Sequence, residues 1–249
     1  METIVPKTSA ALSSLLRADF TTQWRNRRSS ILILLVPVLI LISWKGIIDK
    51  MGGAFALSTC ITLGLIAVGL MGYSNAIARD RDKGVFQRLR VTPVPTWSIM
   101  VSRLMVQLAM ILLLTAVVFF AGYYFDKISL APIGYILTFF TAIIGGALYL
   151  GLGQMIVGLV KNAETVNSTT RLVYFVFIMV GIVGDLGALG ADFKNGVHWS
   201  PYGTVKTILS ASMQPSSWSN QTTLALLATV VYAIIFGTLG IKNFKWSTQ

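Results

Sequence analysis

Charged residues are scarce in this sequence. Asp, Glu, Lys and Arg make up 12% of its 249 residues, against about 25% in ordinary soluble domains. Apolar residues supply 55%, and the mean hydropathy is +0.73. This composition excludes the ordinary soluble globular classes and predicts an integral membrane protein.

Residue types that carry chemistry are also few. The sequence has one cysteine, Cys60, and one histidine, His198. A single cysteine excludes an intrachain disulfide framework and a cysteine-rich metal site, so we expect no bound metal. There is no GxxxxGK[ST] phosphate loop and no HExxH motif, and no set of nucleophile, base and metal ligands is evident. We therefore expect a non-catalytic chain, and we interpret His198 as a solvent or interfacial residue.

Long apolar runs dominate what is present. An apolar stretch of roughly 18 residues or more with few charges is typical of a transmembrane helix, whereas a strand of a membrane barrel needs only about 10. Six such stretches predict an all-α polytopic membrane protein with six transmembrane helices in a single domain over 1–249. They cover residues 29–48, 54–78, 104–125, 133–160, 172–189 and 222–241.

The distribution of basic residues predicts the orientation. If both termini and the loops 79–103 and 161–171 share one side, that side holds all but five of the 20 Lys and Arg residues. The remaining five are Lys45, Lys50, Lys127, Lys194 and Lys206. Cytoplasmic loops carry the Lys and Arg excess, so we expect both termini in the cytoplasm. This asymmetry already explains the net charge of +11, and we expect no nucleic-acid partner.

Two segments outside these spans are amphipathic. In 8–28, apolar residues recur every four positions up to Trp24 and arginines suit anionic headgroups, which predicts an interfacial helix bound to membrane lipid. A plain helical tail is the alternative. Segment 185–221 mixes glycines with apolar residues, Trp199, Tyr202 and Trp218. It predicts short re-entrant or interfacial helices on the outer side, with the aromatic rings at headgroup depth.

The charged loop 79–97 separates the second and third spans. Its charge density excludes it from lipid. If residues 80–89 form one helix, Asp82, Phe86 and Leu89 lie along one edge, which a membrane subunit can press into a groove of a soluble partner. The prolines that follow restrict the backbone toward the third span. An ordinary solvated loop whose charges only set the topology is the alternative.

This loop resembles the ABC transporter type-2 permease family, especially its drug- and antibiotic-export branch. The resemblance rests on Arg79-Asp80-Arg81-Asp82-Lys83-Gly84, then Arg88-Leu89, then Thr92-Pro93. The six spans, the amphipathic N-terminal helix and the segment before the last span extend it over essentially the whole chain. Asp80 and Asp82 stand where the family commonly has glutamate, and Lys83 where it often has Glu.

The resemblance implies the membrane-spanning permease subunit of an ATP-driven exporter. Such a subunit moves an amphiphilic or lipophilic substrate (a drug, antibiotic, peptide or lipid) out of a bacterial cell by alternating access. The implied partners are two copies of a cytoplasmic ATP-binding subunit, which use ATP and Mg, and a second permease in a homodimer or related heterodimer. This chain is expected to bind no cofactor and to lie in the cell membrane as a multi-pass protein.

The resemblance also assigns the residues that couple to the ATPase. They are Arg79, Asp80, Asp82, Gly84, Phe86, Arg88, Leu89, Thr92 and Pro93. Lys161 and Glu164, in the loop 161–171, form a possible second coupling loop, for which a simple turn is the alternative. No residue is singled out for substrate binding. Two other functions stay open: an ABC-independent membrane immunity or resistance protein, and a permease for a surface polysaccharide.

Overall fold

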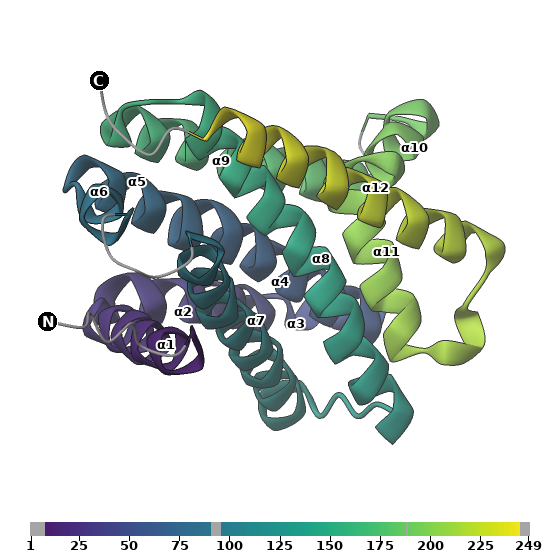
Figure 1. Ribbon diagram of the computed structural model, residues 1–249. Helices are drawn as coiled ribbons and strands as arrows, with labels where there is room; N and C mark the ends of the chain where they lie inside the picture. Colours follow the sequence, from purple (N-terminus) through teal and green to yellow (C-terminus); the bar gives the residue numbers. More distant parts are fainter. Residues whose placement is uncertain (1–7, 91–95, 188, 245–249) are drawn as a thin grey trace, which may run out of the picture.

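The computed structural model describes residues 8–90, 96–187 and 189–244, and in these ranges all regular structure is helical (Figure 1). The predicted all-α polytopic architecture is confirmed. The helices are α1 (Thr8–Arg25), α2 (Arg27–Ser43), α3 (Lys45–Met51), α4 (Gly53–Ile66), the π-helix η1 (Ala67–Ser74), α5 (Asn75–Asp82), α6 (Val85–Arg90), α7 (Thr96–Asp126), α8 (Pro132–Leu159), α9 (Ala163–Leu186), α10 (Ala191–Trp199), α11 (Pro201–Met213), the 3-10 turn η2 (Pro215–Ser217) and α12 (Asn220–Asn243).

Within the described ranges, five helices are long and apolar enough to cross a membrane. They are the continuous unit Gly53–Asp82, formed by α4, η1 and α5, and the helices α7, α8, α9 and α12. The first predicted span is α2, which has 17 residues and follows α1 after a bend of 59°. At 1.5 Å per residue, α2 is somewhat shorter than the roughly 30 Å hydrocarbon layer. The number of spans is six if the bent pair counts as one.

The unit Gly53–Asp82 is the centre of the bundle. In its most apolar stretch 89% of the residues are buried, against 17% in α9 and in α12. The outer helices instead expose large apolar side chains such as Phe175 and Ile234. A soluble protein would cover such helices with polar side chains, so this apolar surface suits a lipid or protein neighbour around α9 and α12.

Close backbone approaches hold α8 against its neighbours. A Cβ atom placed on Gly158 would lie 2.7 Å from the carbonyl oxygen of Gly240 in α12, so the two helices meet at a point that admits only glycine. Beside the π-helix, the Tyr73 hydroxyl donates to Gln154 Oε1 of α8 at 2.7 Å. Small residues of α8 therefore allow tight helix packing.

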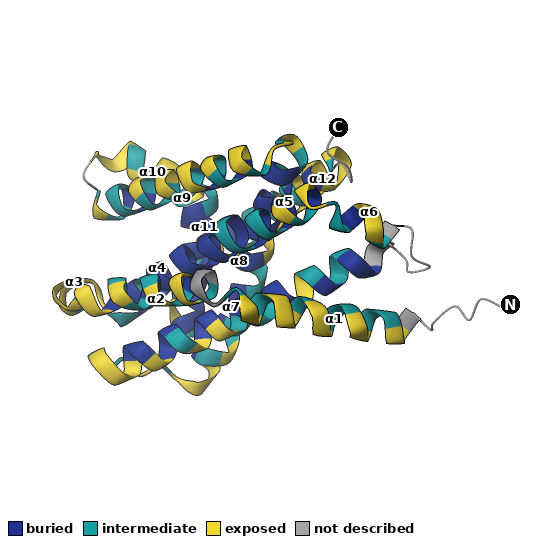
Figure 2. Cartoon of the chain, turned by 90° about the vertical axis from the view of Figure 1, so that its left-hand side faces the viewer, coloured by how far each residue is buried: buried dark blue, intermediate teal, exposed yellow. Residues whose placement is uncertain are grey.

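The bundle has two distinct ends. In Figure 2, α6, the beginning of α1 and the last turns of α12 lie at one end, whereas α3 and α10 lie at the other. We call these the inner end and the outer end. The Phe86 ring of α6 packs edge-to-face on Phe244, just beyond α12, with 5.8 Å between ring centroids. The segments predicted to share the cytoplasmic side thus meet at the inner end, while the side of the membrane they face stays a prediction.

The segment before the last span contains the predicted short helices. α10 is mostly exposed, but α11 is mostly buried and packs against α4, α8 and α12. Trp199 and Trp218 are partly exposed, as expected for interfacial residues. Tyr202 differs from the prediction, because it is fully buried and its hydroxyl donates to Asp185 Oδ2 at 2.9 Å.

Candidate functional site

The charged loop forms two helices, so the hypothesis of one helix over 80–89 is wrong. α5 ends at Asp82 and α6 begins at Val85. Gly84 lies between them with φ of +67°, and its N–H donates to the Arg81 carbonyl at 3.0 Å. This left-handed conformation suits glycine at the end of a helix. It turns α6 away from the axis of α5.

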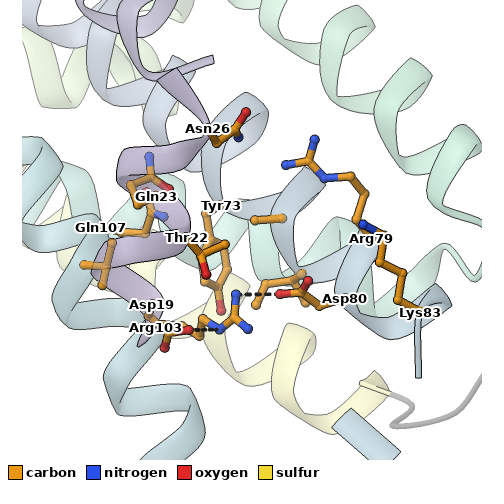
Figure 3. A pocket seen from close by; sticks show the side chains of 13 residues that line it. Asp19, Thr22, Gln23, Asn26, Tyr73, Arg79, Asp80, Lys83, Arg103 and Gln107 are labelled. Atoms are coloured by element: carbon orange, nitrogen blue, oxygen red, sulfur yellow. Dashed lines mark ion pairs between the residues drawn. The ribbon is translucent and has the colours of Figure 1, made fainter. Parts of the chain in front are cut away.

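Asp80 belongs to an ion cluster that joins three helices (Figure 3). Arg103 of α7 lies between two carboxylates: its Nη1 is 2.5 Å from Asp80 Oδ2, and its Nε is 3.1 Å from Asp19 Oδ1 of α1. The Ser102 hydroxyl donates to the other Asp19 oxygen at 2.5 Å. Burial raises the pKa of the Asp19 carboxyl above its usual range, although Arg103 and Ser102 favour the ionised form. We call Asp19, Asp80 and Arg103 the inner ion cluster.

Arg81 joins α5 to the end of α8, a role that the sequence analysis missed. Its side chain is buried, and its guanidinium donates to three carbonyl oxygens, one in the last turn of α8 and two in the connection that follows it. The acceptors are Val157 at 2.7 Å, Val160 at 2.8 Å and Lys161 at 2.5 Å. A signal was present in the sequence: Arg81 follows the buried Ile77 by four positions, which places both on one helix face.

Asp82 reaches the beginning of α9. Its Oδ2 accepts a hydrogen bond from the Ala163 N–H at 3.3 Å, and the Asn162 side chain accepts one from the Glu164 N–H at 2.7 Å. Both acceptors satisfy N–H groups of the first turn of α9. The two predicted coupling loops are therefore one connected surface, on which Lys161 and Glu164 are exposed.

The other predicted coupling residues divide into exposed and buried ones. Arg79 and Arg88 are exposed. Phe86 is fully buried against the chain's own core. This corrects the prediction that Phe86 lies in the middle of an apolar edge offered to a partner, because its side chain is not accessible. Leu89 is partly buried and packs against the same core. Thr92 and Pro93 lie outside the described residues.

A polar cavity of about 230 Å³ lies between α1, α5 and α7 beside the inner ion cluster. Tyr73, Gln107, Arg79 and Lys83 also line it (Figure 3). In the described ranges, no group of three or more His, Cys, Asp or Glu side chains is placed to hold a metal ion. The inner end therefore offers charges, hydrogen-bond donors and connected helices.

These observations define a polytopic helical membrane protein whose inner loops are joined to its spans by specific charged contacts. The model of the ABC-2 type transporter family matches residues 10–202. The chain belongs to this family and is a membrane-spanning permease subunit of an ABC transporter, a system that includes an ATP-binding partner. No protein with a curated description matches the chain.

Proposed function

We propose that this permease is part of an exporter, with its inner end facing the cytoplasm and docked on the ATP-binding subunits. Two copies of that subunit would bind ATP and Mg, while this chain is non-catalytic and binds no cofactor itself. Two permeases, identical or related, would enclose the path in a bacterial cell membrane. The observation that carries the proposal is the α5–α6 unit, which exposes basic side chains at the inner end while Asp80, Arg81 and Asp82 join it to α1, α7, α8 and α9.

The connections supply a route for coupling. α5 continues without a break through η1 and α4 to Gly53 at the outer end. Arg81 and Asp82 hold the α8–α9 connection, and the inner ion cluster holds α1 and α7. A displacement of α6 by a docked subunit would therefore move these helices together, as alternating access requires.

The structure refines which side chains are available for docking. Phe86 is held in the core, whereas Asp82 is exposed but its Oδ2 already accepts a hydrogen bond from the Ala163 N–H. Arg79, Lys83 and Arg88 are exposed, and we assign the contact with the ATP-binding subunit mainly to them. Basic side chains of this kind favour an acidic groove and raise the rate of association.

The substrate is proposed to be amphiphilic or lipophilic, such as a drug, antibiotic, peptide or lipid. Large exposed apolar side chains along α9 and α12, together with few charges in the spans, support this class. A surface polysaccharide would be favoured by aromatic rings stacked along an open path. Two ring pairs do stack, Phe120 with Tyr124 and Tyr232 with Phe236, but each pair lies within a single helix. The Phe119 ring packs edge-to-face against Tyr135 and Phe139.

Purification of the tagged full-length chain from membranes of its own host tests the proposal. We expect a protein with a GxxxxGK[ST] phosphate loop to co-purify and to hydrolyse ATP. Arg88→Glu should abolish co-purification, whereas Lys45→Glu, which changes an exposed basic residue of α3 at the outer end, should not. A chain that confers resistance with no ATP-binding protein attached would contradict the exporter and favour the ABC-independent immunity function.

A further inference from the structure

The outer end contains a second cavity, which no part of the proposed function uses. Its volume is about 420 Å³. It lies where α3, α4, α9, α10, α11 and α12 come together, and its lining includes Phe55, Asp185, Lys194, His198 and Lys206. We call it the outer cavity. Unlike the apolar surroundings of the spans, its wall carries several charged groups.

Lys206 places its side-chain amino group in this wall. The residue is only 8% exposed, and its Nζ is 2.6 Å from Asp185 Oδ2. The same ammonium lies 3.6 Å from the centroid of the Phe55 ring, in a cation–π contact. Because burying an ion pair costs much of the attraction it gains, the pair is weak evidence for a stabilising role. Its position in a cavity wall points to a binding role instead.

Among the described residues that line the outer cavity, two lysines accompany one carboxylate. Lys194 contributes a second ammonium and, among the described residues, forms no ion pair. Asp185 is the only carboxylate in the lining. His198 Nε2 is buried without a hydrogen-bond partner in the described structure, while Nδ1 lies 3.4 Å from the Thr207 hydroxyl. With Thr207 donating to Nδ1, Nε2 carries the ring proton and is an unused donor.

The remaining wall is apolar on one part and hydroxylic on another. Met51, Phe55, Val197 and Ala211 provide the apolar part, and Thr207 and Ser210 add hydroxyl groups. An ion such as free phosphate would use the donors but leave the apolar wall without a partner. A compound with both an anionic headgroup and a hydrocarbon chain would use both.

We propose that the outer cavity binds an amphiphile with an anionic headgroup, a phosphate or a carboxylate, which contacts Lys194, Lys206 and His198. Two sources share this chemistry: a lipid of the outer leaflet, and the exported compound at the end of its path. The second source rests on the proposed export function, whereas the binding chemistry itself does not.

Radiolabelled dodecyl phosphate binding to the full-length protein in phosphatidylcholine nanodiscs tests the proposal. We expect saturable binding that dodecyl maltoside and inorganic phosphate do not displace. Lys194→Gln and His198→Ala should each weaken binding about five- to tenfold, the loss expected for one charged or donor contact. Lys45→Gln, on the exposed helix α3 at the same end, should leave binding unchanged.

Asp185→Asn gives a change in the opposite direction. The Asn side chain can still accept the hydrogen bond from the Tyr202 hydroxyl. The substitution removes the carboxylate that competes with the ligand for Lys206, so binding of dodecyl phosphate should become tighter by about threefold or more. General damage to the fold would not strengthen binding. Unchanged binding in the Lys194 and His198 variants, weaker binding in Asp185→Asn, or equal displacement by inorganic phosphate would each overturn the proposal.

Further measurements identify the source of the ligand and keep the two proposals apart. Displacement by phosphatidylglycerol added to the nanodiscs assigns the cavity to a membrane lipid, and persistent binding assigns it to an exported amphiphile. Export is measured separately, in cells that express the whole transporter. Absent binding with intact export refutes the outer cavity alone. Binding without an associated ATPase refutes the exporter alone.

Discussion

Arg81 illustrates how one side chain satisfies a helix end inside an apolar protein. Carbonyl groups at the end of α8 have no helical partners, and in a low-dielectric environment each one left unpaired is costly. The guanidinium supplies several N–H donors in a fixed planar arrangement, which matches three carbonyls at once. An ammonium cannot reproduce this geometry.

We predict that Arg81→Met destabilises the protein strongly. Three carbonyls lose their donor, which should cost on the order of 3 kcal/mol and lower the apparent melting temperature in detergent by roughly 5–10 °C. Arg81→Lys should recover part of the loss. Arg88→Met, which changes an exposed arginine of the neighbouring helix, is the control and should melt like the parent. Equal melting temperatures for Arg81→Met and the parent would contradict the assigned role.

Gly84 provides the second prediction at this scale. Its φ of +67° is unfavourable for residues with a branched Cβ, by about 1–2 kcal/mol, although a Cβ atom there would meet only Gln87 Oε1, at 3.5 Å. Gly84→Val should therefore disturb the α5–α6 turn and reduce capture of the ATP-binding subunit, while Gly84→Asn, which tolerates this conformation, should retain it. Co-purification from host membranes measures both. Identical capture by the two variants would show that the turn conformation is not required.

At the scale of helices, hydropathy predicts three of the five long spans to within four residues at each end, because lipid demands long apolar segments whatever the fold. The helices α7 and α9 begin eight and nine residues before their predicted spans, since their first turns carry polar and charged side chains that a hydropathy pattern excludes. The charged loop was less predictable. Alternating charge indicates an aqueous segment but does not show that Gly84 ends one helix, or that Phe86 turns back to Phe244 near the other end of the sequence. The ion cluster of Asp19, Asp80 and Arg103 joins residues from three helices. No local pattern contains that pairing.

The inner ion cluster makes a prediction about pH. Arg103→Gln leaves the carboxylates of Asp19 and Asp80 close together without their cation, so stability should fall most near neutral pH. Burial already raises the pKa of Asp19. A carboxyl whose folded-state pKa is raised contributes stability that is lost as pH rises through that pKa. Melting temperatures of the variant should therefore recover as the pH is lowered to about 5, and adding Asp19→Asn should remove this dependence. A pH-independent loss would contradict the cluster.

At the scale of the whole molecule, the alternation of inner and outer ends makes the orientation testable. The last turn of α12 lies at the inner end and α10 at the outer end (Figure 2), and the excess of Lys and Arg places the inner end in the cytoplasm. A reporter fused to the C-terminus should be cytoplasmic, and one inserted at Asp192 should be external. Both reporters in one compartment would contradict the topology.

Coupling depends on which parts of the molecule move as one body. Because Asp82 and Arg81 bind the α8–α9 connection, we expect α5 and the beginning of α9 to stay together during transport. A short, reducible thiol cross-link between Asp82→Cys and Ala163→Cys should therefore leave export nearly unchanged. The native Cys60 is buried and should not react. The same cross-linker on Asp19→Cys and Ser102→Cys tests whether α1 stays with α7 in the same way. Export by the cross-linked complex in vesicles, before and after reduction, measures both. If the first cross-link stops export and reduction restores it, α5 and α9 must separate in the cycle, and the force would pass from α6 along α5 alone.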